Sequence, residues 1–285
     1  MTRYPKRVSL AAWNVNKQQN DEKPYLEMND LMVCNEDGDF VKKKFSLVAC
    51  THLSDNMINR LPEWVEYHRL VGFDHFMIYI DSPNVDVYRK ILEKYKQRHP
   101  NLVTFVPFFF INNRRSEFAG QGDCVSRLKG ISKLAAVFDV DEFFCNLDNS
   151  TTLASIVMKS IDSDQSLAGV YGKSFLFGTI TGEYPDSWKL FIENFILRMP
   201  TSAKLKRDKG IVVPDRVDYV ANHNPTGGEH SKVANSLNEF RINHFRHPSL
   251  DGEWIKSQII EDRSLQDGFS TQIKLELQNS GIALQ

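Results

Sequence analysis

The sequence has few cysteines, and their arrangement excludes several protein classes. Cys34, Cys50, Cys124 and Cys145 are scattered and form no Cys-X-X-Cys pair, so we expect neither a zinc cluster nor a disulfide scaffold. Cys50 and Cys145 fall in apolar runs, which predicts that both are small core residues. This cysteine usage favours a reducing compartment.

Long apolar runs and an excess charge of either sign are also missing. No stretch approaches the ~20 apolar residues of a membrane-spanning helix, and no signal-peptide pattern opens the chain. We therefore expect a soluble, cytoplasmic protein. The 35 basic and 36 acidic residues nearly cancel, so no overall field favours nucleic acid. The basic cluster at 204–209 is best interpreted as a solvated loop, but it is of interest if a phosphate donor lies nearby.

The glycine-rich phosphate-binding motifs are absent. Neither Gly-X-Gly-X-X-Gly nor the Walker phosphate loop occurs in the chain. A diphosphate bound by this protein would therefore depend on side chains and a metal ion.

What the sequence does contain is a regular alternation of strand-like and helix-like segments between residues 45 and 144. Strands are expected at 45–51, 75–80 and 102–107 and in the apolar run from 135, separated by helices over about 61–71, 86–99 and 121–132. This order predicts an α/β fold with a parallel sheet covered by helices. The polar loops that end the first two strands, 51–56 and 81–84, then lie at one edge of the sheet.

The rest of the chain has a different character. Residues 1–44 are polar and are interpreted as an N-terminal arm that wraps the domain, and 45–285 as a single domain with halves 45–146 and 147–285. In the second half we expect helices at 151–159 and 254–261, strands at 167–177, 211–214, 216–221 and 241–245, and loops at 178–186 and 222–230.

Two acids interrupt the apolar run at 135–144, in the order Phe138-Asp139-Val140-Asp141-Glu142-Phe143-Phe144. If the strand stays extended, Asp139 and Asp141 point to the same side and reach one point in space. Two acids at one point repel unless a cation lies between them or one is protonated. Mg²⁺ and Mn²⁺ take such oxygen ligands, often together with substrate phosphates. The alternative is a solvated acidic strand end.

Several motifs together resemble glycosyltransferase family 92 and its relatives near family 2. They are Pro62-Glu63-Trp64-Val65-Glu66-Tyr67-His68, Gly72-Phe73-Asp74-His75-Phe76-Met77-Ile78-Tyr79, Asp123-Cys124-Val125-Ser126-Arg127, the Asp139-Val140-Asp141-Glu142-Phe143 run and Asn243-His244-Phe245. The similarity covers roughly residues 45–260. In length, the chain resembles short soluble members of the family, some of which are encoded by large algal viruses.

The resemblance implies a GT-A fold: a central, mostly parallel sheet flanked by helices, with a smaller antiparallel part on the acceptor side. The half 45–146 would bind the nucleotide sugar and 147–285 the acceptor. It also implies a metal-dependent inverting glycosyltransferase that uses Mn²⁺ or Mg²⁺. The expected donor is UDP-galactose or UDP-xylose, and the acceptor is a glycan or glycoprotein hydroxyl, such as fucose of an N-glycan. The oligomeric state is not fixed.

The chain departs from the family pattern in two respects. Ser54-Asp55-Asn56 stands where the family usually carries Asn-Glu, so the base contacts differ. The usual N-terminal anchor is missing, which favours the cytoplasm, of a virus-infected host if the protein is viral. The Golgi lumen is expected instead if an anchor has been removed.

The resemblance assigns metal and donor roles to particular residues. Asp141 would bind the metal directly, and Asp139 would bind the ribose, or the metal through water. His244 is the expected late histidine ligand, with His223 as its competitor and His247 as a weaker candidate. Glu142 either orients the site or is a surface acid. Residues expected to contact the nucleoside or diphosphate are Thr51, His52, Asp81 and Arg127.

An inverting transfer needs a base that takes the proton of the acceptor hydroxyl. Asp186, beside Trp188, is the first candidate because a sugar can stack on the indole ring. Glu183 and Glu229 are further candidates, and the alternative for Asp186 is an ordinary helix cap.

Three other functions remain open from the sequence. A haloacid-dehalogenase-like phosphatase or phosphotransferase also uses Asp-X-Asp at a strand end, although usually on the first strand. A non-catalytic sugar-binding module would bind donor and metal without turnover. A nucleotidyltransferase would release pyrophosphate instead of a nucleoside diphosphate.

Overall fold

The computed structural model describes residues 6–12, 26–33, 44–82, 85–108, 113–147, 150–179, 189–200, 208–221, 224–226, 232–245 and 259–282. The chain divides into two compact units, Met1–Lys42 and Lys43–Gln285. In the first unit, β1 (Lys6–Ala12) and β2 (Leu26–Val33) pair antiparallel. The sequence interpretation predicted neither strand.

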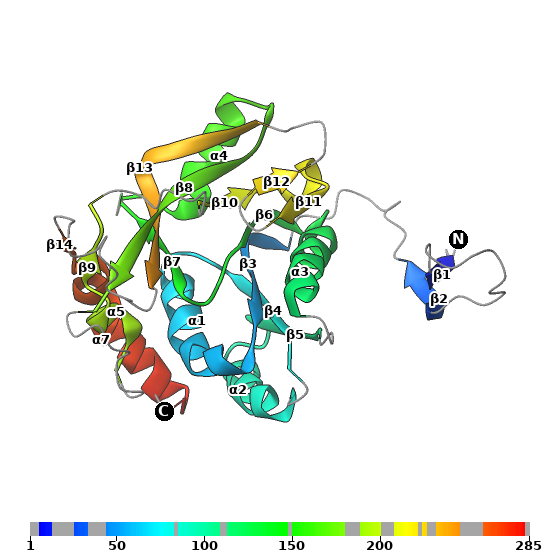
Figure 1. Cartoon of the computed structure of the whole chain (residues 1–285), viewed down its shortest axis with the longest axis horizontal. Helices are drawn as coiled ribbons and strands as arrows, with labels where there is room; N and C mark the ends of the chain where they lie inside the picture. Colours follow the sequence, from blue (N-terminus) through cyan, green and yellow to red (C-terminus); the bar gives the residue numbers. More distant parts are fainter. Residues whose placement is uncertain are drawn as a thin grey trace. The chain divides into compact units, whose positions relative to one another are not determined.

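The second unit begins with a four-stranded parallel half-sheet (Figure 1). Its strands are β3 (Phe45–Leu53), β4 (His75–Ile80), β5 (Val103–Pro107) and β6 (Ser132–Val137). The helices between them are η1 (Asp55–Arg60), α1 (Leu61–Leu70), α2 (Val85–Arg98) and α3 (Asn113–Leu128). The spatial order is β5-β4-β3-β6, so the direction of winding reverses between β3 and β6.

The two faces of this half-sheet are covered by different helices. Leu47 and Ala49 of β3 pack in one core with Trp64 of α1, whereas Val48 packs in a second core with Val125 of α3. This alternation follows from the two-residue period of a strand buried on both faces. Figure 1 shows α1 and α3 on opposite sides of β3 and β4. The α/β class predicted from the sequence is confirmed.

The remaining strands extend the sheet, mainly in antiparallel fashion. These elements are β7 (Glu142–Asn146), α4 (Leu153–Ser163), β8 (Leu167–Gly178), α5 (Phe191–Asn194), β9 (Leu197–Arg198), β10 (Lys209–Val212), η2 (Pro214–Arg216), β11 (Tyr219–Ala221), β12 (Asn224–Thr226), β13 (Lys232–Phe245), β14 (Ile260–Glu261) and α7 (Ser264–Asn279). Strand β10 lies antiparallel between β6 and β8. Strand β13 pairs parallel with β8 and antiparallel with β7. The GT-A arrangement expected from the family resemblance, parallel first and antiparallel later, is therefore observed.

The C-terminal helix α7 joins the end of the chain to the first half of the domain. Glu276 of α7 forms ion pairs with Arg98 of α2 at 2.7 Å and with Arg69 of α1 at 3.3 Å. The prediction of a closing helix at 254–261 is wrong for its last two residues, because Ile260 and Glu261 form strand β14. Helix α7 was not predicted, since its polar first turns and Gly268 weaken the helical pattern.

Two other element boundaries differ from the sequence expectations. Helix α3 runs from Asn113 to Leu128, not over 121–132, because Gly130 adopts a positive φ of 72° and turns the chain into β6. The strand expected at 216–221 is replaced by η2 and the short β11. Pro214 suits the first turn of η2, since its missing N–H needs no partner there.

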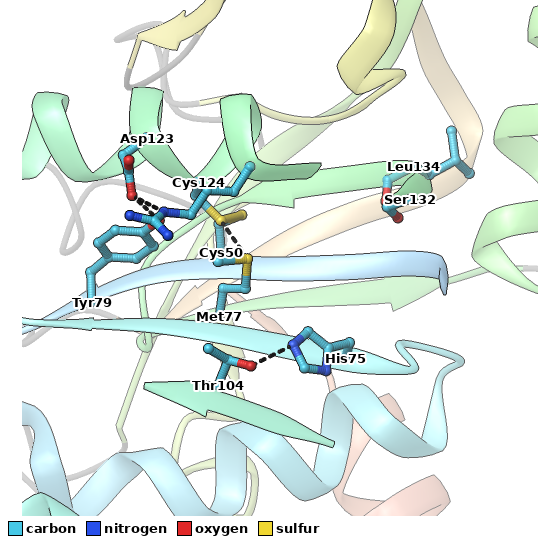
Figure 2. The surroundings of a disulfide bond; sticks show 10 residues. Cys50, His75, Met77, Tyr79, Thr104, Asp123, Cys124, Ser132 and Leu134 are labelled. Carbon is cyan, nitrogen blue, oxygen red and sulfur yellow. Dashed lines mark hydrogen bonds and ion pairs between the residues drawn. A yellow bond between two sulfur atoms is a disulfide. The ribbon is translucent and has the colours of Figure 1, made fainter. Parts of the chain in front are cut away.

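A disulfide joins Cys50 of β3 to Cys124 of α3, with Cα atoms 6.3 Å apart (Figure 2). Cys50 is buried in the core, as predicted, but the expectation that the cysteines form no disulfide is wrong, and the argument for a reducing compartment loses its basis. Cys145 is free and buried, as predicted. Across the described ranges, no helix has both the length and the apolarity needed to cross a membrane.

Candidate active site at the reversal of the sheet

The acidic residues lie where β6 ends, next to the point at which the strand order reverses. In open α/β sheets, ligands bind outside the carboxyl ends of the strands at such a point. Strand β6 ends at Val137, and the Glu142 N–H donates to the Asp139 carbonyl at 3.0 Å. The condition that the strand stays extended through both acids is therefore not met. Asp139 contacts Lys209, and Asp141 faces His244.

Asp141 faces His244. Asp141 Oδ2 lies 3.6 Å from His244 Nε2, and the Phe245 N–H donates to the Asp141 carbonyl at 2.7 Å. Pairing of β13 with β7 brings these groups together, since His244 is opposite Glu142 in the register. Burial opposes ionisation, but His244, Arg60 and Lys209 together hold the pKa of Asp141 below its ordinary value. The competing His223 lies outside the described residues.

Glu142 connects the two parts of the acidic cluster. Its Oε2 accepts from the Asp139 N–H at 2.9 Å and from Lys209 Nζ at 3.1 Å, and its Oε1 lies 3.8 Å from His244 Nδ1. The residue is 1% exposed, so it is not a surface acid. Burial raises its pKa to about 7, although Lys209 opposes the shift. These contacts support an orienting role for Glu142.

Lys209 at the start of β10 is the residue that sequence reasoning missed. Its ammonium lies 3.2 Å from Asp139 Oδ2 and 3.1 Å from Glu142 Oε2, and its side chain is 1% exposed. Burial lowers its pKa, but Asp139 and Glu142 outweigh this and raise the pKa above its ordinary value. One signal in the sequence could have found it. Lys209 stands two residues before Ile211, so in a strand both side chains lie on the same, buried face.

A very small cavity, with room for about one water molecule, lies at the ends of β3 and β4. Thr51, His52, Tyr79 and Gln121 help to line it, and Gly120 leaves the helix backbone close to His52. Thr51 is 3% exposed, and its hydroxyl has no hydrogen-bond partner among the described residues. A buried hydroxyl without a partner is costly, so a ligand that bonds to it gains affinity. The predicted nucleoside contacts Thr51 and His52 therefore lie together.

Asp81 lies beside His52, as the sequence interpretation requires. Asp81 Oδ2 is 3.8 Å from His52 Nε2, and the two side chains are 4% and 10% exposed. Burial lowers the pKa of His52, although Asp81 and Asp139 favour its charged form. The ends of β3 and β4 therefore present an imidazole and a carboxylate side by side.

Arg127 is held by a neighbour on its own helix. Its Nε donates to Asp123 Oδ2 at 2.6 Å. The same oxygen accepts from the Tyr79 hydroxyl at 2.6 Å (Figure 2). The Arg127 side chain is 56% exposed. Its role toward a diphosphate stays a prediction. The candidate bases lie outside the described residues, namely Asp186, Glu183 and Glu229.

The chemistry of the Asp141–His244 pair fits one divalent cation. No group of three His, Cys, Asp or Glu side chains arranged to hold a metal occurs in the described part of the chain. An ion such as Mg²⁺ needs only one or two protein ligands when substrate phosphates and water complete its shell. Neighbouring ligand atoms in an octahedral shell with bonds of about 2.1 Å lie roughly 3.0 Å apart. Asp141 Oδ2 and His244 Nε2 are 3.6 Å apart, so both can bind one ion after a small movement of either side chain.

An α/β sheet that reverses its strand order beside clustered acids is typical of a nucleotide-binding enzyme. Comparison with known families makes the class specific. The model of glycosyltransferase family 92 matches residues 46–280, and the chain belongs to that family. The resemblance found in the sequence motifs is confirmed.

Similar curated proteins carry the same family description. A glycosyltransferase family 92 protein of Ricinus communis is 33% identical over 101 residues, which is 35% of this chain and 16% of that protein. A second match to that description in the same organism is 28% identical over 138 residues, which is 48% of this chain and 24% of that protein. The matched segments thus span no more than about a quarter of these relatives.

Solved structures resemble the chain only distantly. The crystal structure of GalNAc-T7 with UDP, GalNAc and Mn²⁺ has a TM-score of 0.42 at 10% identity, over 73% of this chain and 45% of that one. HddC from Yersinia pseudotuberculosis has a TM-score of 0.34 at 12% identity, over 70% and 92%. At these scores, neither structure informs the activity of this chain.

Proposed function

We propose that this chain is a metal-dependent, inverting glycosyltransferase that moves a sugar from a UDP-sugar to a glycan hydroxyl. Galactose and xylose are the donor sugars to test first, and the acceptors include glycoprotein glycans, with fucose of an N-glycan among them. The observation that carries the proposal is the buried Asp141–His244 pair at the reversal of the sheet in a family 92 domain.

Each part of the site has a separate task in this proposal. Asp141 and His244 would hold Mn²⁺ or Mg²⁺, which neutralises the charge of the leaving diphosphate when bound. Asp139 accepts a hydrogen bond from the ribose, or from water on the metal. Thr51, His52 and Asp81 bind the nucleoside, and Arg127 approaches the diphosphate from α3.

The acceptor half supplies the proton acceptor. Asp186, Glu183 and Glu229 are the candidates to take the proton from the attacking hydroxyl. The family assignment removes the support for a haloacid-dehalogenase-like phosphatase, because the acidic motif here belongs to a family 92 domain.

The test is transfer from a panel of UDP-sugars to glycan acceptors, with Mn²⁺ or with EDTA, for wild type and Asp141→Asn. We expect nucleoside diphosphate release that EDTA abolishes and that Asp141→Asn lowers roughly 100-fold or more, since even second-layer ligands often cost 10- to 100-fold. Asp162→Asn, an exposed acid on α4, is the control and should keep full activity.

Other results would assign another function. Equal activity of wild type and Asp141→Asn would contradict the metal role. Donor and metal binding without turnover on any acceptor would indicate a sugar-binding module. Release of pyrophosphate would indicate a nucleotidyltransferase, and hydrolysis of phosphate monoesters without a sugar donor would indicate a phosphatase.

A further inference from the structure

Asp139 is held by one of its two carboxylate oxygens. Lys209 Nζ donates to Asp139 Oδ2 at 3.2 Å, while the Asp139 side chain as a whole is 42% exposed. No hydrogen bond to Oδ1 is found within the described ranges. One face of the carboxylate is therefore fixed by the protein, and the other remains open to a ligand.

The position of Lys209 is set by the sheet. Strand β10 pairs with β8, where Lys209 is opposite Gly172, and with β6, where Ile211 is opposite Ala136. This pairing places the ammonium against the connection that follows β6. Because Glu142 Oε2 also accepts from Lys209 at 3.1 Å, the ammonium lies between two carboxylates.

A buried lysine in such a place requires a reason. Removing its charge from water is costly, and replacing buried ion pairs by apolar residues is often neutral or stabilising. The pair is therefore a poor stabilising device. It is, however, an effective way to fix the direction of a carboxylate that must meet a ligand.

We propose that Lys209 is a positioning residue that orients Asp139 toward the nucleotide and keeps it separate from the metal-binding pair Asp141–His244. This inference rests on the proposed function and deepens it. In this inference Asp139, which Lys209 holds, binds the nucleotide, whereas Asp141, which faces His244, binds the metal ion. Lys209 acts through Asp139, since its own side chain is buried and does not reach the open face.

The experiment measures UDP affinity in the presence of Mn²⁺ by calorimetry for wild type, Lys209→Met, Asp139→Asn and the double variant. We expect Lys209→Met to raise the Kd of UDP roughly 10-fold or more. In the Asp139→Asn background, Lys209→Met should add little, because the group that it orients is already changed. The Mn²⁺ concentration needed for half-maximal UDP binding should stay within about 2-fold of wild type.

A matched control removes a different lysine–carboxylate pair. Lys274 on α7 lies 2.5 Å from Glu193, and Lys274→Met should leave UDP affinity unchanged. Unchanged UDP affinity in Lys209→Met overturns the inference, and so does a loss that persists in full in the Asp139→Asn background, as a purely structural role predicts. Failure of wild type to bind UDP with Mn²⁺ overturns the proposed function itself, which is a distinct result.

Removal of Lys209 alone leaves Glu142 without its cation, so the variant can fail to fold. In that case Lys209→Met is combined with Glu142→Gln, which removes the opposing buried charge, and is compared with Glu142→Gln alone. Weaker UDP binding by the combined variant supports the inference. Equal UDP binding by these two variants overturns it.

Discussion

Glu63 is a buried acid whose ionisation affects stability. It is 2% exposed, and its carboxylate accepts from the N–H groups of Phe191 at 2.7 Å and Ile192 at 2.9 Å. Burial is the largest influence and raises its pKa to about 7, although these two bonds and Arg60 oppose the shift. The start of α5 is therefore tied to α1 by a group that titrates near neutral pH.

Glu63 should make stability fall as the pH rises. A folded pKa above the ordinary 4.5 means that the protonated form is favoured in the folded state. This contribution is complete below about pH 4.5 and is lost as the pH rises to about 7. The unfolding free energy of wild type should fall between about pH 4.5 and about pH 8. We expect Glu63→Gln to reduce this fall by up to about 3 kcal/mol.

Urea unfolding at a series of pH values measures this difference. Glu261→Gln, which changes an exposed acid, should follow the wild-type curve. A Glu63→Gln curve parallel to wild type would show that Glu63 does not titrate as expected. Glu142, whose pKa is also raised to about 7, should leave a residual slope in the variant.

At the level of elements, close approach between β8 and β10 depends on Gly169. A Cβ at this position would lie 2.6 Å from the carbonyl oxygen of Ile211. We expect Gly169→Ala to lower the unfolding free energy by about 1–3 kcal/mol, since backbone must shift. At Gly268 of α7, an added Cβ would have no atom within 4 Å. Gly268→Ala should therefore raise the unfolding free energy by about 1 kcal/mol, because alanine favours the helix.

Chemical denaturation of both variants at one pH is the measurement. The opposite signs make the comparison informative, because each variant adds the same methyl group. Loss of stability in Gly268→Ala, or none in Gly169→Ala, would contradict the packing described for these elements.

The disulfide ties the crossover helix α3 to the central strand β3. It closes a sequence separation of 74 residues, and in the chain-entropy view a loop of this length contributes at most about 4.5 kcal/mol. We expect dithiothreitol to lower the unfolding free energy of wild type by about 2–4 kcal/mol and to leave a Cys50→Ala/Cys124→Ala variant unchanged.

Non-reducing peptide mapping gives a direct check on the bond. It should recover a peptide pair joined through Cys50 and Cys124, with Cys145 free. Two free thiols at 50 and 124, together with a stability that is insensitive to reductant, would contradict the assignment.

For the molecule as a whole, the division into two units predicts where the chain can be shortened. The unit Met1–Lys42 is compact by itself, and the family match begins at residue 46. We expect removal of residues 1–42 to leave UDP affinity with Mn²⁺ within about 2-fold of the full chain. A shortened chain that fails to fold, or binds UDP much more weakly, would show that the second unit depends on the first.

Local patterns were sufficient to predict the parallel half of the molecule. Its strands are apolar runs ended by polar loops, so the positions of Thr51, His52 and Asp81 at one edge followed from the order of elements. Sequence motifs also singled out the acids and the late His244, and the fold brings Asp141 within 3.6 Å of His244. Their roles stay predictions.

Pairings between distant parts of the chain were not predictable in the same way. The Cys50–Cys124 bond, the turn that parts Asp139 from Asp141, and the contact of Lys209 with the acids each depend on which elements pack together. Nothing in the local sequence around Lys209 distinguishes it from the other cations of 204–209 except its place before Ile211. Tertiary packing decided these features.

The order in which the ribosome makes the chain has a consequence for this protein. Asp141 is synthesised with the parallel strands, whereas His244 lies near the end of β13, which pairs with both β7 and β8. A growing polypeptide therefore carries the acid long before its histidine emerges from the exit tunnel. If Asp141 and His244 hold the metal ion as proposed, a chain released before residue 244 is made lacks one of these two ligands.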